Sequence, residues 1–111
     1  MQYKVLVLAT AKEFLAGLEL KLRAKAYRTL EMLGKFGYKL TMPYCRKIKG
    51  TDDLYELRIK QGTDICRLFY FYYEAQMYVI LAGFIKKQNK TNPVEIARAL
   101  RIKRDYLEGK K

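Results

Sequence analysis

The chain has 111 residues and a formal net charge of +12 at pH 7, from 23 Lys and Arg against 11 Asp and Glu. Half of its residues are hydrophobic, so a single domain spanning residues 1–111 can bury a core without disulfide or metal support. Histidine, serine and tryptophan are absent, which excludes Ser-His-Asp and Cys-His nucleophilic sites and any zinc site that uses histidine.

The cysteines and the apolar segments predict a protein of the cytoplasm. Cys45 and Cys66 are too few for a disulfide framework, and reduced thiols are the ordinary state in that compartment. The longest apolar run, residues 77–85, is far shorter than the roughly 20 residues of a membrane-spanning helix. The N-terminal apolar run is shorter than that of a signal peptide. We therefore expect neither a leader nor contact with a membrane.

The N-terminal part of the sequence predicts a strand followed by helix. Residues 2–8 alternate loosely and are rich in Val and Leu, which is typical of a strand. Residues 10–13 read Thr-Ala-Lys-Glu, a capping-box sequence that predicts a helix start. Apolar residues then recur every three or four positions, which predicts one helix, or two if Gly17 interrupts it. Gly34 or Gly37 is expected to end this stretch.

The second half predicts a strand meander and a last helix. After a connection at residues 35–51, three segments alternate in polarity or are rich in apolar and aromatic residues: 54–60, 65–73 and 77–84. Short turns separate them, so they predict antiparallel pairing, with the third segment inside the sheet. Residues 92–95, Asn-Pro-Val-Glu, predict the start of a helix that Gly109 ends. The expected fold is α+β, in the order β-α(α)-β-β-β-α, with the helices on one face.

Positive charge is concentrated in two stretches that contain no acid. One lies between Glu31 and Asp52, and the other between Glu74 and Glu95. Both flank the predicted meander, and a basic surface beside exposed tyrosines suits a phosphate backbone with stacked bases. Solvated, inert lysines are the alternative interpretation. The candidate RNA-binding residues are Lys47, Lys49, Lys60, Lys86 and Lys90.

Two arginines on the predicted strands are sharper candidates. Arg58 lies on the polar face of its strand, whereas Arg67 lies among apolar and aromatic residues. The guanidinium of Arg67 must therefore be paired or directed into a cleft. A buried ion pair with Glu56 is one interpretation, and a planar cationic donor for a phosphate is the other. The two are compatible, because Glu56 can orient an arginine that also binds phosphate.

The order of these motifs resembles the RelE/HigB superfamily of bacterial toxins, and most of all its phage-derived HigB-like subgroup. The motifs are Leu-Tyr-Glu-Leu-Arg at residues 54–58, Arg67 before Phe-Tyr at residues 69–70, and Gly-Phe-Ile-Lys-Lys at residues 83–87 ahead of Lys-Thr-Asn-Pro at residues 90–93. The resemblance extends from about residue 20 to residue 108. It implies the toxin of a type II toxin–antitoxin system, which enters the ribosomal A site, cuts mRNA and inhibits translation.

The resemblance also implies an endoribonuclease, an mRNA interferase, that needs no metal and no cofactor. In this chemistry the ribose 2′-OH attacks its own 3′-phosphate and leaves a cyclic phosphate and a 5′-OH. Arg58 and Arg67 match residues that grip the scissile phosphate. Lys87, together with Lys86, matches the basic residue after the last strand, which stabilises charge or assists the leaving group. With no histidine in the chain, Glu56 is the first candidate for the general base.

The partners implied by the resemblance are mRNA on the ribosome and a cognate helix-turn-helix antitoxin that holds the toxin inactive, with a heterotetramer as one candidate stoichiometry. Two other interpretations stay open at this stage. The first is a non-catalytic basic module that binds RNA or DNA, because the chain has no histidine. The second is a structural phage protein, which would not need arginines on a strand face.

Overall fold

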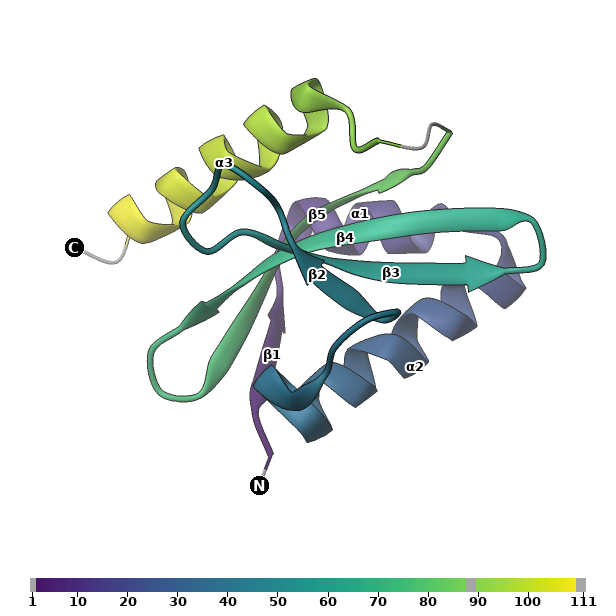
Figure 1. Ribbon diagram of the computed structural model, residues 1–111, viewed down its shortest axis with the longest axis horizontal. Helices are drawn as coiled ribbons and strands as arrows, with labels where there is room; N and C mark the ends of the chain where they lie inside the picture. Colours follow the sequence, from purple (N-terminus) through teal and green to yellow (C-terminus); the bar gives the residue numbers. More distant parts are fainter. Residues whose placement is uncertain (1, 88–89, 110–111) are drawn as a thin grey trace.

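The computed structural model describes residues 2–87 and 90–109, which form a five-stranded sheet and three α-helices (Figure 1). The elements in chain order are β1 (Lys4–Val7), α1 (Ala9–Ala16), α2 (Leu20–Phe36), the 3-10 helix η1 (Gly37–Lys39), β2 (Cys45–Lys47), β3 (Tyr55–Gln61), β4 (Asp64–Tyr73), β5 (Met77–Ile85) and α3 (Pro93–Glu108). The strand order is β1-β5-β4-β3-β2, with β1 parallel to β5 and the other neighbours antiparallel. The predicted α+β fold and its meander are confirmed.

The sheet is covered by helices on both faces. Helices α1 and α2 pack against one face, where Leu57 and Leu68 lie in the core. Helix α3 packs against the other face, where Phe69 and Leu81 meet Ala99 of α3. The expectation that all helices lie on one face is therefore wrong. Strands β4 and β5 are buried on both faces, and each apolar face has to be covered.

The predicted N-terminal helical stretch is two helices, α1 and α2. Glu19 begins α2 by accepting hydrogen bonds from two backbone N–H groups of the first turn, and Gly37 ends it at a positive φ of 57°. The capping box predicted for α1 is wrong, because the helix begins at Ala9. Thr10 Oγ1 instead donates to the carbonyl of Leu81 at 2.5 Å, so a contact between α1 and β5 replaces the local cap.

The meander and the last helix agree closely with the sequence. The turn between β4 and β5 holds Ala75 and Gln76 at positive φ, where the sequence predicts a turn. The side chain of Asn92 accepts from Val94 N at 2.8 Å and so caps α3. Leu100 of α3 is 38% exposed, whereas Ala99 is buried. None of the helices in the described segments is long and apolar enough to cross a membrane.

Strand β2 is the element that the sequence pattern misses. Its three residues lie inside the segment 35–51, which was expected to be a connection. A strand this short shows no readable alternation, and it is defined only by its pairing with β3. This edge strand places Arg46 opposite Glu56, and the site described below depends on that register.

Candidate active site

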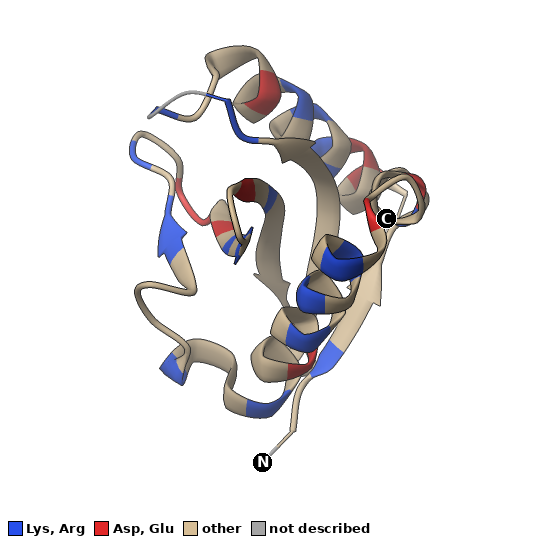
Figure 2. Ribbon diagram, turned by 90° about the vertical axis from the view of Figure 1, so that its right-hand side faces the viewer, with Lys and Arg blue, Asp and Glu red and all other residues tan. Residues whose placement is uncertain are grey.

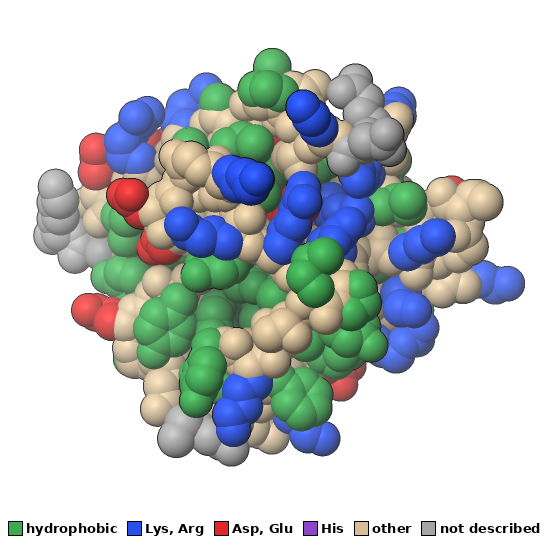
Figure 3. Space-filling model, in the orientation of Figure 1, with side chains coloured by type: hydrophobic (Ala, Val, Ile, Leu, Met, Phe, Trp, Pro, Cys, Tyr) green, Lys and Arg blue, Asp and Glu red, His purple; other side chains and the backbone are tan. Residues whose placement is uncertain are grey.

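Basic side chains surround one buried carboxylate on the α3 face of strands β2, β3 and β4. The register pairs Arg46 with Glu56, and Arg58 with Arg67. Side chains two positions apart in a strand point to the same face, so Glu56 and Arg58 share a side. With Lys86, which follows β5, these residues are called the basic cluster. Figure 3 shows Lys and Arg side chains gathered over the centre of the face seen there.

Glu56 is the fully buried centre of the basic cluster, with 0% of its surface exposed. Its Oε1 accepts from Arg46 Nε at 2.9 Å and lies 3.9 Å from Arg67 Nε. Its Oε2 accepts from Thr91 Oγ1 at 3.0 Å. The predicted ion pair between Glu56 and Arg67 is confirmed. The carboxylate therefore holds two arginines and the segment before α3 in fixed positions, since a buried charge requires such partners.

Arg58 and Arg67 keep donors that the described part of the chain does not satisfy. Arg67 is 4% exposed, and its Nη1 donates to the carbonyl of Cys66 at 3.2 Å. Nε of Arg58 and Nε of Arg67 are buried and have no hydrogen bond to any described residue. For Arg67, Oε1 of Glu56 lies 3.9 Å away, which is beyond hydrogen-bond range. Buried donors are normally satisfied by protein groups, water or a ligand, and among ligands a guanidinium group favours anions.

Burial and neighbouring charges act together on the guanidinium of Arg67. Burial lowers the pKa of Arg67 from its ordinary value, Glu56 opposes that shift, and the charges of Arg58 and Arg46 lower the pKa further. Like charges held this close repel one another, and the single carboxylate of Glu56 offsets only part of that repulsion. The electrostatics and the unsatisfied donors thus point to the same ligand chemistry, an anion such as a phosphate.

Lys86 is electrostatically coupled to the arginines. Partial burial lowers the pKa of Lys86, the charges of Arg67 and Arg58 lower it further, and Glu56 opposes the shift. The backbone N–H of Lys86 donates to the carbonyl of Ile65 at 2.9 Å, which fixes the end of β5 beside the start of β4. The neighbouring Lys87 is exposed and lines an adjoining cavity. Of the two lysines predicted after the last strand, Lys86 feels the charges of the arginines and belongs to the basic cluster.

The remaining candidate lysines are spread around the basic cluster. Lys60 is exposed on the same face of β3 as Arg58. Lys47 alternates with Arg46 along β2 and so lies on the other face of that strand. Lys49 and Lys90 are exposed on loops. Figure 2 shows basic positions on β2, on the loop after it and around the segment that follows β5, all along one side of the molecule.

Sequence reasoning missed Arg46 and Thr91, both of which contact Glu56 directly. Arg46 stands in the acid-free stretch, but only the register of β2 distinguishes it from Lys47 and Lys49. Thr91 could have been considered because it directly precedes Asn92, where the last helix is predicted to start. A hydroxyl at that position can contact the sheet as well as the helix.

Comparisons with known proteins identify the family and the fold of the chain. The family described as Phage derived protein Gp49-like (DUF891) matches residues 13–104. The structure is similar to a mutant of the E. coli toxin RelE in the free state, with a TM-score of 0.66 and 15% identity over 91% of this chain and 97% of that chain. It is also similar to a chain of the archaeal RelE–RelB complex from Pyrococcus horikoshii, with a TM-score of 0.58 and 19% identity over 82% and 100% of the two chains.

A third similar structure is the toxin–antitoxin complex RelBE2 from Mycobacterium tuberculosis, with a TM-score of 0.57 and 19% identity over 78% of this chain and 100% of that chain. Among curated proteins, no sequence matches the chain at a significant level. The family match covers most of the chain, including the meander and the basic cluster. The chain therefore belongs to the phage-derived Gp49-like family and has the RelE-like toxin fold.

Proposed function

We propose that this protein is the toxin of a type II toxin–antitoxin system and cleaves mRNA on the ribosome as an endoribonuclease. The observation that carries the proposal is the basic cluster, whose cationic side chains gather around the single carboxylate of Glu56 and leave a net positive charge on one face of the sheet. The RelE-like fold supports it. Because ribosomes are cytoplasmic, the proposed site of action is the cytoplasm.

In the proposed reaction the 2′-oxygen of a ribose forms a bond to the adjacent phosphorus, and the bond from that phosphorus to the 5′-oxygen of the next nucleotide breaks. The 2′-OH loses its proton to water, and the departing 5′-oxygen gains one from the ammonium group of Lys87, which gives a cyclic phosphate and a 5′-OH. Arg58, Arg67 and Lys86 stabilise the extra negative charge of the phosphorane, for which one preorganised donor is typically worth a factor of about 100 to 1,000. Lys87, the next residue along the chain, is proposed to assist the leaving group.

Glu56 is proposed to position the arginines. As the first candidate for the general base it would have to reach the 2′-OH, but it has no exposed surface and both of its oxygens have partners. In-line alignment of the 2′-oxygen by the arginines can supply much of the rate without a strong base. The proposed partners are mRNA and an antitoxin whose acidic groups complement a net charge of +12.

A second candidate function is a basic module that binds RNA or DNA without cutting it. The burial of Glu56 favours this alternative, because the basic cluster then offers no accessible carboxylate to take the proton. The two functions share the phosphate-binding arginines and differ only in whether the RNA is cut.

Induction of the protein in growing cells, followed by mapping of mRNA 5′ ends, distinguishes the two functions. Wild type is expected to arrest growth and to give cuts in phase with codons. Arg67→Ala should lower cleavage by about 100-fold or more, because it removes a phosphate donor, while the exposed Arg104→Ala serves as the matched control and cuts normally. Circular dichroism establishes that Arg67→Ala is folded, and Arg67→Lys, which keeps the charge, is expected to recover part of the activity. Full activity of Arg67→Ala contradicts the assignment, and intact growth without cuts in wild type supports the binding module.

A further inference from the structure

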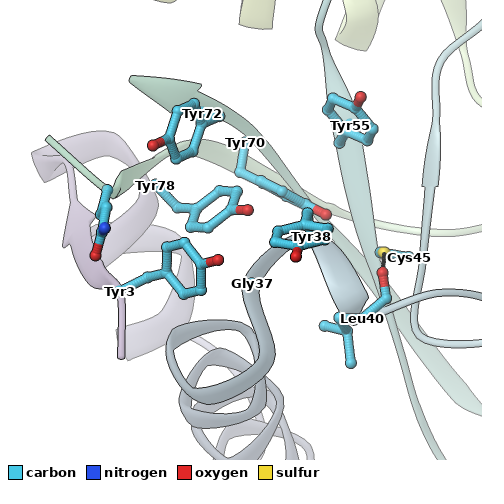
Figure 4. Close-up of a pocket in the computed structure, with 10 residues that line it drawn as sticks. Tyr3, Gly37, Tyr38, Leu40, Cys45, Tyr55, Tyr70, Tyr72 and Tyr78 are labelled. Atoms are coloured by element: carbon cyan, nitrogen blue, oxygen red, sulfur yellow. Dashed lines mark hydrogen bonds between the residues drawn. The ribbon is translucent and has the colours of Figure 1, made fainter. Parts of the chain in front are cut away.

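A second concave feature lies on the face of the sheet that α2 covers, opposite to the basic cluster. It is a cavity of about 380 Å³ between the end of α2, β1 and the β4–β5 hairpin. Within the described residues it is lined by tyrosines from five different segments: Tyr3, Tyr38, Tyr55, Tyr70, Tyr72 and Tyr78. Figure 4 shows their rings arranged around the opening. This feature is called the tyrosine pocket.

The walls of the tyrosine pocket are held by contacts between rings. Tyr78 has edge contacts with Tyr3, Tyr70 and Tyr72, at centroid distances of 5.5, 5.7 and 5.2 Å. Gly37 gives the space for this arrangement, since a Cβ at that position would lie 2.1 Å from the Tyr3 ring. Rings packed edge to face lose little freedom when a ligand binds, so the pocket is preformed.

The lining of the tyrosine pocket suits a flat, uncharged ring with hydrogen-bonding edges. None of the lining residues carries a charged side chain at neutral pH, and the polar groups are hydroxyls together with the amide of Gln76 and the thiol of Cys45. Burial is the main cause that raises the pKa of Tyr78 to about 12 and also raises that of Tyr70, so both hydroxyls stay protonated donors. The cavity volume is near the lower end of the range for small-molecule sites, about 300–1,000 Å³.

Two of the tyrosines offer ring surface to a ligand. Tyr38 is 73% exposed and Tyr72 is 44% exposed, whereas Tyr70 and Tyr78 are buried behind them. In Figure 4 the hydroxyls of Tyr3 and Tyr78 point toward the side on which Tyr38 lies. A base entering between Tyr38 and these hydroxyls would stack on an exposed ring and receive hydrogen bonds at its edge, which is how single-stranded RNA bases are generally held.

The tyrosine pocket adjoins the basic cluster along the chain. Cys45 of the pocket precedes Arg46 in β2, and Tyr55 precedes Glu56 in β3, so each strand presents one site on each face. Figure 3 shows a hollow lined by hydrophobic side chains beside the basic side chains. Lys39 lines a neighbouring cavity that shares Tyr3 and Tyr38 with the tyrosine pocket, and it adds a cation for a backbone phosphate. A strand of RNA that crosses β2, the short edge strand, would meet both sites.

We propose that the tyrosine pocket holds a nucleobase of single-stranded RNA, from a nucleotide flanking the phosphate in the basic cluster. This inference rests on the proposed function and extends it to base recognition outside the cleavage site. Base–aromatic stacking is tolerant of sequence, while the hydroxyls and Gln76 can distinguish base edges. The pocket would therefore fix the path of the RNA and add preference for certain bases.

Saturation-transfer NMR of the full chain with the four nucleoside 5′-monophosphates tests this inference, with ribose 5-phosphate as the ligand that lacks a base. We expect transfer to base protons, and weaker binding of ribose 5-phosphate. Tyr38→Ala should weaken nucleotide binding by about 5- to 150-fold, the value of one stacked base, and Tyr38→Phe should retain it. The matched control is Tyr27→Ala, an exposed tyrosine of α2 outside the pocket, which should bind as wild type does.

The inference is overturned if no base proton receives saturation, or if Tyr38→Ala binds nucleotides as well as Tyr27→Ala does. It is also overturned if nucleotides fail to bind while an antitoxin peptide contacts Tyr38, since the pocket is then a protein-docking site. Its failure is distinguishable from that of the proposed function. RNA cleavage without base binding removes only the pocket assignment, and base binding without cleavage removes only the nuclease assignment.

Discussion

The basic cluster and the tyrosine pocket lie on opposite faces of the same strands and differ in the forces that hold them. In the basic cluster, one buried carboxylate positions guanidinium groups that still have free donors. In the tyrosine pocket, ring contacts hold an uncharged cavity open. Successive side chains along β2 and β3 point to opposite faces of the sheet. The same pair of strands therefore carries a charged site on one face and an aromatic site on the other. The first should respond strongly to salt and to loss of charge, and the second should respond to changes in shape.

The largest expected effect is the response to salt. Between 50 and 200 mM salt, affinity for RNA should fall by about three orders of magnitude if the basic surface contacts about six phosphates, because each contact releases counterions. Binding of an uncharged nucleoside to the tyrosine pocket should change little over the same range. Fluorescence anisotropy measures how the affinity for a labelled RNA changes with salt, and NMR titration measures the same dependence for the nucleoside. A flat response for RNA would contradict the basic cluster as the docking site.

Removal of the central carboxylate should be the largest effect on stability. Glu56→Ala leaves Arg67 buried without a counterion, and breaking a buried pair in this way costs about 3–5 kcal/mol. Glu56→Gln should cost less, because the amide oxygen still accepts from Arg46. Urea unfolding measures both changes, with the exposed Glu74→Ala as the control, expected within about 0.5 kcal/mol of wild type. A small change for Glu56→Ala would mean that the arginines do not depend on this carboxylate.

A pair of glycines tests the shape of the tyrosine pocket. Gly37 and Gly62 both have positive φ, at 57° and 63°, but only at Gly37 would a Cβ meet another residue, the Tyr3 ring. Gly62→Ala should therefore lower the free energy of unfolding by about 1–2 kcal/mol, the cost of holding a residue with a Cβ at positive φ. Gly37→Ala should cost about 1–3 kcal/mol more for the overpacking and should weaken nucleotide binding. Thermal unfolding and the NMR titration compare the two, and equal losses would show that Tyr3 moves away freely.

Much of the fold could be predicted because its signals are local. The alternation in β3, the aromatic residues of β4 and the Asn92–Pro93 helix start all depend on near neighbours in the chain, and each is confirmed. The capping box at Thr10 failed because a contact with Leu81 of β5 replaced it. The placement of the helices on one face failed for a similar reason, since two buried faces each required a cover.

The candidate site was predictable in part. Arg58, Arg67 and Glu56 were identified from their strand positions, and the ion pair between Glu56 and Arg67 is confirmed. Arg46 was missed because a three-residue strand has no pattern to read, so only its pairing with β3 shows which basic residue reaches Glu56.

The sequence by itself determined the strand meander, the helical segments, the excess of positive charge and the one arginine, Arg67, that an apolar strand context makes unusual. Only the tertiary structure decided which basic residues share Glu56, and that tyrosines from position 3 to position 78 line one cavity. The physical reason is that periodicity and turn residues are set by neighbours along the chain. A site made of side chains from several strands is set by register and by the parallel pairing of β1 with β5, which bring distant segments together.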